Sequence, residues 1–530
     1  MRTLFVAGSV VLTAVLLGLT YLQPMWGWSF LLVGPVLVRG YQDLLQTRQA
    51  VRRNFPILGN FRYLFELVRP EINQYFVESN TDGAPFNRDT RSLVYQRSKL
   101  EPDTLPFGTR LDVNQVGYEW VNHSLAPTHI DPASLRITVG SSQCTQPYSA
   151  SIFNVSAMSY GSLSKNAILA LNGGAKKGDF AHDTGEGGIS PYHLEPGGDI
   201  IWEVGTGYFS ARTLDGKFSP ERFKENAQRP QVKMTELKLS QGAKPGHGGI
   251  LPAAKVTQEI ATIRGVPLGQ DVLSPPAHSS FSTPIGLLEF LQQMRELSGG
   301  KPVGFKLCIG KRREFLAICK AMKTTGIVPD FITVDGGEGG TGAAPLEFSN
   351  SVGAPLRESL IFVHNSLVGF GVRKQIKVFC SGRIVTGFDV VSRLATGADA
   401  CNSARAMMMA LGCIQALRCN TNECPTGVAT QNPSLVVGLD VNHKTTRVAN
   451  YHRETLKSVA EMVGAMGVHH TSALRPWHLM KRTGLSEIHH YGELYQFIEE
   501  GSLLGTSYPE SFARPMAAAR ADSFASNARE

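Results

Sequence analysis

The stretch PVGFKLCIGKRREFLAICKAMKTTGIVPDFITVDGG, residues 302–337, contains two apolar runs separated by an amphipathic segment. The two runs, PVGFKLC and FITVDGG, have the length and the β-branched and aromatic content of buried strands. Between them, KRREFLAICKAMKTTG repeats apolar residues at the spacing of one helix face. A strand, a helix and another strand in this order are typical of a parallel βα unit.

The same unit recurs along the chain. SIFNVSA precedes SLSKNAILALNGGAKK, KVFCSG precedes TGFDVVSRLATG, and DACNSA precedes RAMMMALGCIQAL. At least six such units within roughly 270 residues predict an α/β fold, a (β/α)8 TIM barrel with its active site at the carboxyl ends of the strands. No G-x-G-x-x-G sequence follows a strand and opens a helix, so we expect no dinucleotide-binding Rossmann unit. The barrel is expected over residues 111–440, followed by a C-terminal helical segment at 441–500 and a tail at 501–530.

The first forty residues differ from the rest. Residues 3–22 carry no charge, which is about the length that crosses a bilayer core as a helix, and a second uncharged run follows at 25–38. We therefore predict a transmembrane anchor in residues 1–40, in the form of a helical hairpin. A cleaved signal peptide is the alternative, and one or two membrane passes both stay open.

Basic residues around the two runs predict the orientation. Arg2 precedes the first run and Arg39 follows the second, whereas the loop between them has no basic residue. This pattern favours both ends in the cytoplasm. The barrel is then expected at the cell membrane, facing the cytoplasm, behind a connecting segment with short helices at 41–110. Eight cysteines in that compartment are not expected to form a disulfide framework.

Composition excludes some classes of protein. The chain is 42% hydrophobic and 18% charged, as globular proteins are, and it has a net charge of +8. No run of Lys and Arg with interleaved aromatic residues is present, so no nucleic-acid partner is expected.

Two loops late in the predicted barrel, CSGRIVTG and CNSARA, each end a strand in small residues and open a helix. Backbone N–H groups at such places bind anions, and two successive ones at this position predict a phosphate-bearing cofactor. Two cations stand elsewhere: Lys244 in QGAKPG and Arg264 in TIRG. Together they suit a substrate with two carboxylates. The alternative is that both are solvated surface cations.

Six motifs then occur in a fixed order. They are AMSYGSLS, TGEGG, QGAKPG, LSPPAH, DGGEGGTGA and C-x5-C-x4-C-P-T-G-V-A-T-Q. Over roughly residues 105–440 the chain resembles the FMN domain of glutamate synthase, in a stand-alone form behind a membrane-anchored N-terminus. The resemblance implies a barrel that binds FMN beside an iron–sulfur cluster. It also implies an oxidoreductase of the class acting on CH–NH2 donors, which condenses 2-oxoglutarate with ammonia and reduces 2-iminoglutarate to glutamate.

The resemblance implies roles for individual residues. Lys244 and Arg264 match the binders of the 2-oxoglutarate carboxylates, Glu186 in TGEGG matches a glutamate where ammonia enters, and Lys238 is grouped with them as a catalytic candidate. The positions that match FMN contacts are Met158, Ser159, Gln241, Lys306, Gly337, Gly382, Ser403, Ala404 and Arg405. As a cation at a strand end, Lys306 could stabilise a reduced flavin or could serve as an ordinary ion-pair partner.

Cys413, Cys419 and Cys424 match the cysteines of the family's iron–sulfur centre. Three thiolates in one loop suit a [3Fe–4S] cluster, whereas structural zinc normally takes four ligands. Cys401 could provide a fourth ligand for a [4Fe–4S] cluster, although its strand position argues against it. Three buried free cysteines are the remaining alternative.

Two departures from the family leave the function partly open. The family often has Glu-Gly-Gly-Gln where this chain has HGGI, so His247 and Ile250 put the substrate in question. The glutaminase domain of the family is not seen before the barrel, so we expect free ammonium or a partner to supply nitrogen. The alternatives are a flavin oxidoreductase acting on another 2-oxo or imino acid or amine, and a membrane-anchored electron-transfer subunit. Electrons are expected from a ferredoxin or a separate NADPH-binding subunit.

Overall fold

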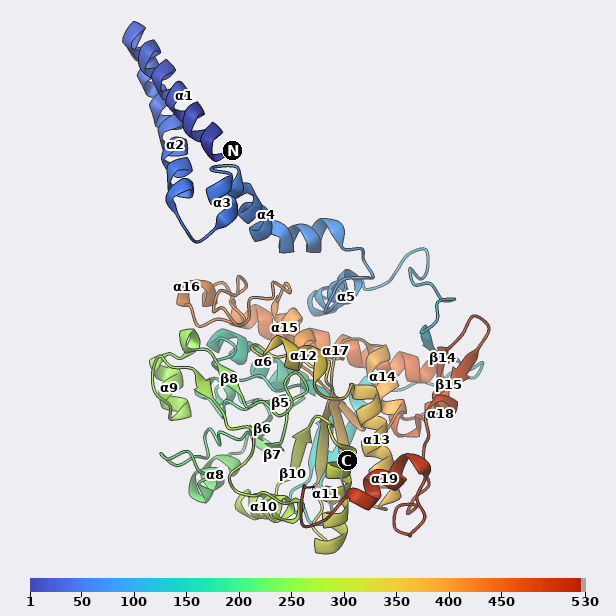
Figure 1. Cartoon of the computed structure of the whole chain (residues 1–530). Coiled ribbons are helices and arrows are strands. Elements are labelled where there is room, and N and C mark those ends of the chain that lie inside the picture. The colour runs from blue at the N-terminus through green and yellow to red at the C-terminus, as the bar shows by residue number, and fades with distance from the viewer. Residues whose placement is uncertain (526–530) are drawn as a thin grey trace. The chain divides into compact units, whose positions relative to one another are not determined.

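The computed structural model describes residues 1–525 of the 530-residue chain (Figure 1). These residues form two compact units, one from Met1 to Arg88 and a second from Asp89 onward. The division falls inside the expected connecting segment at 41–110.

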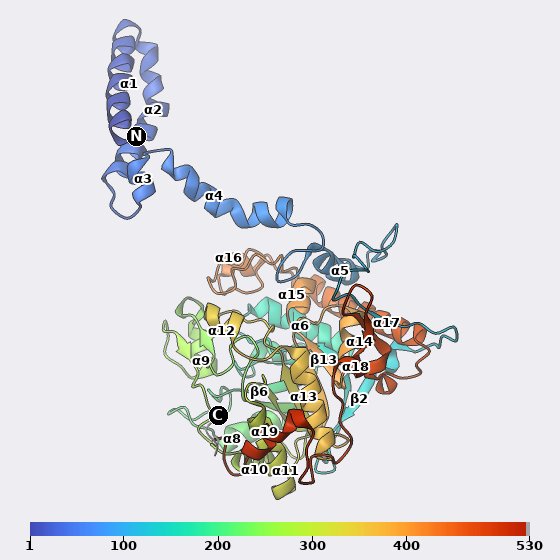
Figure 2. The same ribbon diagram turned by 45° about the vertical axis from the view of Figure 1, so that its right-hand side comes forward.

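The first unit is helical. Its elements are α1 (Arg2–Leu22), a 3₁₀ helix at Pro24–Ser29, α2 (Phe30–Leu45), α3 (Ala50–Asn54), α4 (Gly59–Ile72) and a π-helical turn at Asn73–Val77. Helices α1 and α2 lie side by side as a hairpin (Figure 2), joined by a 2.6 Å hydrogen bond between the hydroxyl groups of Ser9 and Tyr41. Within the described residues, α1 is the one helix long and apolar enough to cross a membrane, a test that a signal sequence also passes. Helix α2 is shorter, at 16 residues, and contains Pro35.

The second unit contains the barrel. In the described range, eight parallel strands close in the order β4–β5–β6–β7–β10–β11–β12–β13, and β13 pairs with β4 through the Cys401–Phe153 register. Their bounds are β4 (Phe153–Val155), β5 (His182–Asp183), β6 (Ile200–Val204), β7 (Val232–Lys238), β10 (Val303–Leu307), β11 (Phe331–Asp335), β12 (Lys377–Ser381) and β13 (Ala400–Ser403). The predicted TIM barrel is therefore confirmed.

Helices surround the strands (Figure 1). They are α6 (Lys165–Gly178), α7 (Pro191–Leu194), α8 (Pro220–Ala227), α9 (Gln258–Arg264), α10 (Pro284–Leu297), α11 (Arg312–Thr325), α12 (Leu346–Ser351), α13 (Leu356–Gly369), α14 (Gly387–Ala395), α15 (Arg405–Leu411), α16 (Pro433–Val436) and α17 (Val441–Ala465). Helix α11 begins after Lys311 and ends at Gly326, whose φ of 73° is left-handed, as helix C-caps commonly are. The 25-residue α17 packs against α6, α14 and α15.

A hairpin of β2 (Arg136–Val139) and β3 (Tyr148–Ser151) covers the amino end of the barrel. Its Val139 and Ala150 are fully buried in one apolar cluster with Phe331 and Phe379, which lie in barrel strands. Burial of these side chains stabilises the fold by removing apolar surface from water. Because this end is packed, a ligand can reach the barrel interior only from the carboxyl end of the strands, which is the usual place for a TIM-barrel site.

The remaining elements decorate the barrel. Strands β1 (Glu119–Val121), β14 (Leu479–Arg482) and β15 (Ile488–His490) form an antiparallel sheet, and β8 (Ile250–Leu251) pairs with β9 (Val272–Leu273). Helices α5 (Arg88–Lys99), α18 (Tyr491–Leu494) and α19 (Glu510–Ala518) complete the set, with 3₁₀ turns at Pro132–Ser134, Ala253–Lys255, Thr471–Ala473 and Pro476–His478.

The segment expected as a tail, 501–530, contains an ordered helix. In α19, Phe512 and Met516 are buried, and the Nζ of Lys320 in α11 donates to the carbonyls of Met516 and Ala519. Residues 526–530 of this segment lie outside the described residues.

Candidate active site at the carboxyl ends of the barrel strands

A pocket opens at the carboxyl end of β7. Its wall includes four residues that the sequence singled out: Glu186, Lys238, Gln241 and His247. The rest of the wall is formed by Thr206, Leu239, Ser240, Gly246, Gly248, Gly249, Pro275 and Pro276. The turn after β5 and the long β7–β8 loop therefore meet where a barrel enzyme holds its substrate.

Glu186 and Lys238 form the ion pair of this pocket. The Nζ of Lys238 lies 2.8 Å from Oε2 of Glu186 and 3.2 Å from Oε1 of Gln241. Burial acts to raise the pKa of Glu186, but the charges of Lys238, Lys244 and Arg264 overcome it and lower that pKa to about 2. The pKa of Lys238 is raised, because its carboxylate neighbours outweigh burial. At neutral pH this pair is therefore a carboxylate and an ammonium group.

Lys244 and Arg264 are both buried, each 3% exposed. The Nζ of Lys244 donates to the carbonyl of Ala343 at 3.0 Å, and Nη2 of Arg264 donates to the carbonyl of Tyr160 at 2.9 Å. Burial lowers the pKa of Lys244 to about 8 and that of Arg264 to about 10, and Glu186 opposes both shifts. The alternative that they are solvated surface cations is therefore wrong.

Arg264 has spare hydrogen-bonding capacity. It ends α9 and places its guanidinium carbon 5.2 Å from the ring centre of Phe209. Its Nε is buried without a hydrogen-bond partner among residues 1–525. A buried donor left unpaired is costly, so this group is positioned to bind an acceptor such as a ligand carboxylate.

Two glycines permit this close packing. A Cβ at Gly187 would lie 2.6 Å from Nη2 of Arg264, and one at Gly249 would lie 1.6 Å from Oε1 of Glu186. The clustered glycines of TGEGG and GHGG thus let the backbone approach these charged side chains, which any larger residue would displace.

The first two residues expected to contact FMN lie in the β4–α6 loop at the same end of the barrel. Met158 and Ser159 are buried, and the Met158 N–H donates to the carbonyl of Asp183 at 3.0 Å. Gln241 donates through Nε2 to the carbonyl of Gly340 at 3.2 Å, which ties the β7 loop to the glycine-rich loop after β11. The Gly337 N–H in that loop donates to the carbonyl of Ala354 at 2.8 Å.

The expected phosphate-binding turns follow β12 and β13. Gly382 has a φ of 149°, and the buried Ser403 hydroxyl donates to the carbonyl of Ile384 at 2.6 Å. Ala404 precedes α15, and Nη2 of Arg405 donates to the carbonyl of Glu338 at 2.7 Å. The structure thus brings these residues together at one end of the barrel.

The guanidinium groups of Arg383 and Arg405 are near enough in this region to repel each other. Burial, followed by the repulsion of Arg383, lowers the pKa of Arg405 to about 10. A pair of neighbouring guanidinium groups is a donor set suited to a phosphate, which Arg binds through paired hydrogen bonds. The residues present therefore fit a phosphate-bearing cofactor.

Lys306 lies deeper in the barrel. It is 2% exposed, and its Nζ lies 2.7 Å from Oε2 of Glu203 on β6. Burial opposes its charge, but Glu203 and nearby carboxylates hold its pKa well above the usual range. Of the two roles expected for Lys306, the structure shows the ion pair.

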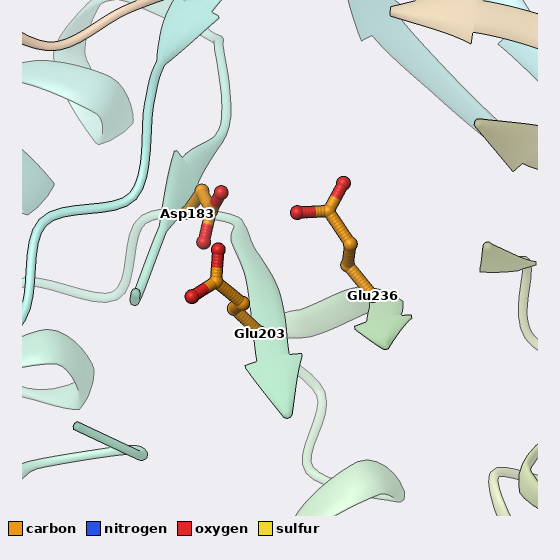
Figure 3. A group of neighbouring side chains, drawn as sticks. All are labelled: Asp183, Glu203 and Glu236. Carbon is orange, nitrogen blue, oxygen red and sulfur yellow. The ribbon is translucent and has the colours of Figure 1, made fainter. Parts of the chain in front are cut away.

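Sequence reasoning missed a group of three carboxylates below the pocket (Figure 3). Asp183, Glu203 and Glu236 project from β5, β6 and β7 and place one carboxylate oxygen each within 4.8 Å of the others. All three are at most 1% exposed. Their signal in the sequence was a charged residue inside an apolar strand run, as in IIWEV and VKMTELK. Such a residue is rare in a buried strand and marks a functional candidate.

The cysteine loop follows α15. Cys424 is buried, whereas Cys413 and Cys419 are half-buried. The Cys424 sulfur lies 3.4 Å from the Thr426 hydroxyl, and hydrogen bonds from that group and from the backbone lower its pKa although burial acts to raise it. These bonds favour a thiolate, which is the form that binds metal.

The same loop is fastened to the first βα loop of the barrel. The Nε2 of Gln431 donates to the carbonyls of Gly161 and Leu163, at 3.0 and 2.8 Å, and the Ser164 hydroxyl donates to the carbonyl of Gly427 at 2.6 Å. The buried Lys255 bridges the two loops as well, since its Nζ donates to carbonyls on both. The cysteines and the expected FMN-contacting loop therefore belong to one connected region.

The cysteine sulfurs do not gather around one point. Within the described part of the chain, Cys413, Cys419 and Cys424 do not bring three sulfurs within 4.8 Å of one another. A single zinc ion, with Zn–S bonds of about 2.3 Å, would hold them closer, whereas in a cluster each thiolate binds a different iron. All eight cysteines are free thiols, and Cys401 lies in the barrel with its sulfur 3.7 Å from that of Cys380.

Comparison with known proteins gives the family. Residues 125–469 match the model of a conserved region in glutamate synthase. The chain belongs to the glutamate synthase family. The glutamate synthase large subunit-like protein YerD of Bacillus subtilis (strain 168) is 36% identical over 468 residues, which cover 81% of this chain and 89% of that protein.

A second relative matches over a shorter region. The archaeal glutamate synthase (NADPH) of Methanocaldococcus jannaschii is 36% identical over 323 residues, and the match covers 61% of this chain and 60% of that enzyme. Among solved structures, a mandelate oxidase variant with (S)-mandelic acid aligns over 81% of this chain and 98% of its own, with 14% identity and a TM-score of 0.42. A likeness at that level says nothing about the function of this family member.

Proposed function

We propose that the chain is an FMN- and iron–sulfur-dependent oxidoreductase of the CH–NH2 class, which converts 2-oxoglutarate and ammonia to glutamate through 2-iminoglutarate. The observation that carries the proposal is the buried cation pair, Lys244 and Arg264, beside Glu186 at the mouth of the barrel. A protein that only passes electrons has no need of buried cations that suit carboxylates. The names of the relatives support the same reaction.

Each of the two cations binds one carboxylate of the substrate. Arg264 offers its unpartnered Nε and the remainder of its guanidinium fork to one carboxylate, and Lys244 offers a point charge to the other. Their fixed positions orient the 2-oxo carbon before reaction, which turns an encounter in solution into a positioned one.

Glu186 and Lys238 are assigned to the nitrogen. A carboxylate in the pocket wall attracts and orients an ammonium ion, and the ammonium group of Lys238 holds Glu186 in place at 2.8 Å. Because both groups keep their charges at neutral pH, the pair orients the incoming nitrogen, and the ammonium group of Lys238 can donate a hydrogen bond to it.

For the cofactors, we infer that Arg383, Arg405 and the turns at Gly382 and Ser403 hold the phosphate of FMN, with Met158, Ser159, Gln241, Gly337 and Lys306 nearer its ring. Cys413, Cys419 and Cys424 would hold a cluster, most simply [3Fe–4S], because three thiols lie in one loop and Cys401 packs against Cys380 instead. When bound, the flavin supplies hydride and the cluster supplies it with electrons from a ferredoxin or an NADPH-binding subunit.

We also propose that the hairpin of α1 and α2 anchors the protein in the cell membrane, with both ends and the barrel in the cytoplasm. The support is the apolar α1, whose side chains are largely exposed, and the placement of Arg2 and Arg39 at the same end of the hairpin.

The proposal is tested by anaerobic reoxidation of the reduced protein. Glutamate should form, and the flavin should reoxidise, only when 2-oxoglutarate and ammonium are both present. A panel of other 2-oxo acids in the same assay measures the effect of His247 and Ile250 on substrate choice. Reoxidation by a monocarboxylic 2-oxo acid at the same rate would contradict the assignment of 2-oxoglutarate.

A further inference from the structure

The three carboxylates below the pocket lie inside a closed, packed barrel (Figure 3). Two ammonium groups face them: Nζ of Lys306 lies 2.7 Å from Oε2 of Glu203, and Nζ of Lys238 lies 3.6 Å from Oε1 of the same residue. Within residues 1–525, neither Asp183 nor Glu236 has a Lys or Arg nitrogen within 4.0 Å of its carboxylate. Three carboxylates against two cations leave one excess negative charge.

Including the next neighbours gives the same balance. Asp335 on β11, Glu186 and Glu338 add three carboxylates, and Lys244, Arg264 and Arg405 add three cations. Asp335 is itself satisfied, because its oxygens accept from the Ser381 hydroxyl at 2.6 Å and the Gly242 N–H at 2.8 Å. The unbalanced charge therefore belongs to the inner cluster, and an uncompensated buried charge costs several kcal/mol.

Glu236 is the group best placed to neutralise it. Its Oε1 accepts a hydrogen bond from the Thr333 hydroxyl, while its Oε2 is buried without a partner in the described residues. Asp183 accepts one bond at Oδ1, from the Gly185 N–H at 3.0 Å. A proton on Oε2 of Glu236 would remove one negative charge from this group of carboxylates. Burial and the carboxylates around it raise the pKa of Glu236 to about 7 and that of Asp183 well above its usual range.

A continuous set of groups joins the cluster to the pocket. Glu203 is followed by Lys238 at 3.6 Å, and Lys238 by Glu186 at 2.8 Å, and both of the latter line the pocket wall. Protons move between acid and base groups that come within hydrogen-bond distance. Lys238 is at that distance from Glu186, and a shift of its side chain by a few tenths of an ångström would bring it to Oε1 of Glu203, which has no other hydrogen-bond partner in the described residues. Among the described elements facing the cluster, this is the route that leads to the substrate side.

We propose that Asp183, Glu203 and Glu236 share one buried proton, resident mainly on Glu236, and that Lys238 and Glu186 pass this proton to the nitrogen of the reacting substrate. Its use there rests on the proposed function. Reduction of an imine adds a hydride to carbon and a proton to nitrogen. Reduced flavin would supply the hydride, and the group of Asp183, Glu203 and Glu236 supplies the proton. Glu236 is left as a carboxylate and is reprotonated from water by the same route.

Infrared spectroscopy of the whole protein tests directly whether one of the three carboxyl groups is protonated. At pH 7 the wild type should show the carbonyl stretch of a buried protonated carboxyl group, which shifts in D2O. Glu236→Gln keeps the size of the side chain and removes the excess negative charge, so the band should be lost. Asp330→Asn is the matched control, because Asp330 is equally buried but is paired with Arg295, and the band should remain.

Exchange kinetics test the route. In Lys238→Met the band should persist, because the three carboxylates lose a neighbouring cation and their excess negative charge still favours a bound proton. Its exchange with D2O should slow by about tenfold or more, because the link to the pocket is removed. These readouts need no substrate, so they stand or fall separately from glutamate synthesis.

Two results would overturn the proposal. One is a wild-type spectrum at pH 7 with no band for a protonated carboxyl. The other is a stoichiometric divalent metal in the purified protein that is lost in Glu236→Gln, which would show that a cation and not a proton balances the cluster. If Glu236→Gln does not fold, the wild-type infrared spectrum still decides the first point.

Discussion

Replacement of Arg264 by lysine tests the hydrogen-bond donors of the guanidinium group separately from its positive charge. In the structure, Nη2 of Arg264 is used by the carbonyl of Tyr160, while Nε is unpartnered in the described chain. Lysine keeps a cation at this place and loses the paired donors. The side chain is 3% exposed, so water cannot substitute for the missing bond.

The size of the effect follows from one lost hydrogen bond to a charged group. Such a bond contributes about 1.5–3 kcal/mol. At about 1.4 kcal/mol per factor of ten, the KM for 2-oxoglutarate should rise by about 10- to 150-fold. The kcat should change less, because the charge that holds the carboxylate is retained in both ground and transition states.

The assay is steady-state glutamate formation with a chemical reductant, at saturating ammonium and varied 2-oxoglutarate. The exposed Arg222, replaced by lysine, is the control and should leave KM unchanged. The reasoning is refuted if folded, flavin-loaded Arg264→Lys protein has the KM of the wild type. A fall in kcat with unchanged KM would show that Arg264 acts on the reaction and not on binding.

Three further predictions concern charge, cluster and anchor. Since burial lowers the pKa of Lys244 to about 8, its ammonium form is lost above that pH; KM for 2-oxoglutarate should rise from pH 7 to 9, and Lys244→Arg should move the rise to higher pH. Cys419→Ser should remove iron and acid-labile sulfide while FMN remains, because serine is a poor ligand where thiolate is wanted, and purified wild type with zinc and no iron would defeat this expectation. Deletion of residues 1–40 should move a yellow, folded protein from the washed membrane fraction to the soluble fraction, and full-length protein already found free of membranes would contradict the anchor.

The sequence predicted the barrel well because each βα unit is specified locally. The stretch at 302–337 contains β10 (Val303–Leu307), α11 (Arg312–Thr325) and β11 (Phe331–Asp335), each within its predicted run. Strand length, helix periodicity and the glycine after each element are all short-range signals. The hairpin of β2 and β3, by contrast, packs against residues of strands that are distant in the sequence. Short-range signals therefore could not predict its position.

The candidate site was predicted in part. Glycine-rich motifs indicated where Glu186, Lys244 and Arg264 would stand, and the structure brings all three to one end of the barrel. The partner of Lys306 could not be predicted, because Glu203 lies on another strand and the pairing depends on how the barrel closes. Glu236 was missed for the same reason, because its neighbours come from four other strands, β5, β6, β10 and β11.

The bonds from Gln431 and Ser164 connect residues that are 263 to 270 positions apart in the chain. Contacts over such separations form late in folding, because the intervening chain must be ordered first. During synthesis, the cysteine loop therefore has no stable place until β13 has emerged from the ribosome and paired with β4. We expect newly made chains to acquire metal only after the barrel has closed, so metal content would report how much of a preparation has completed its fold.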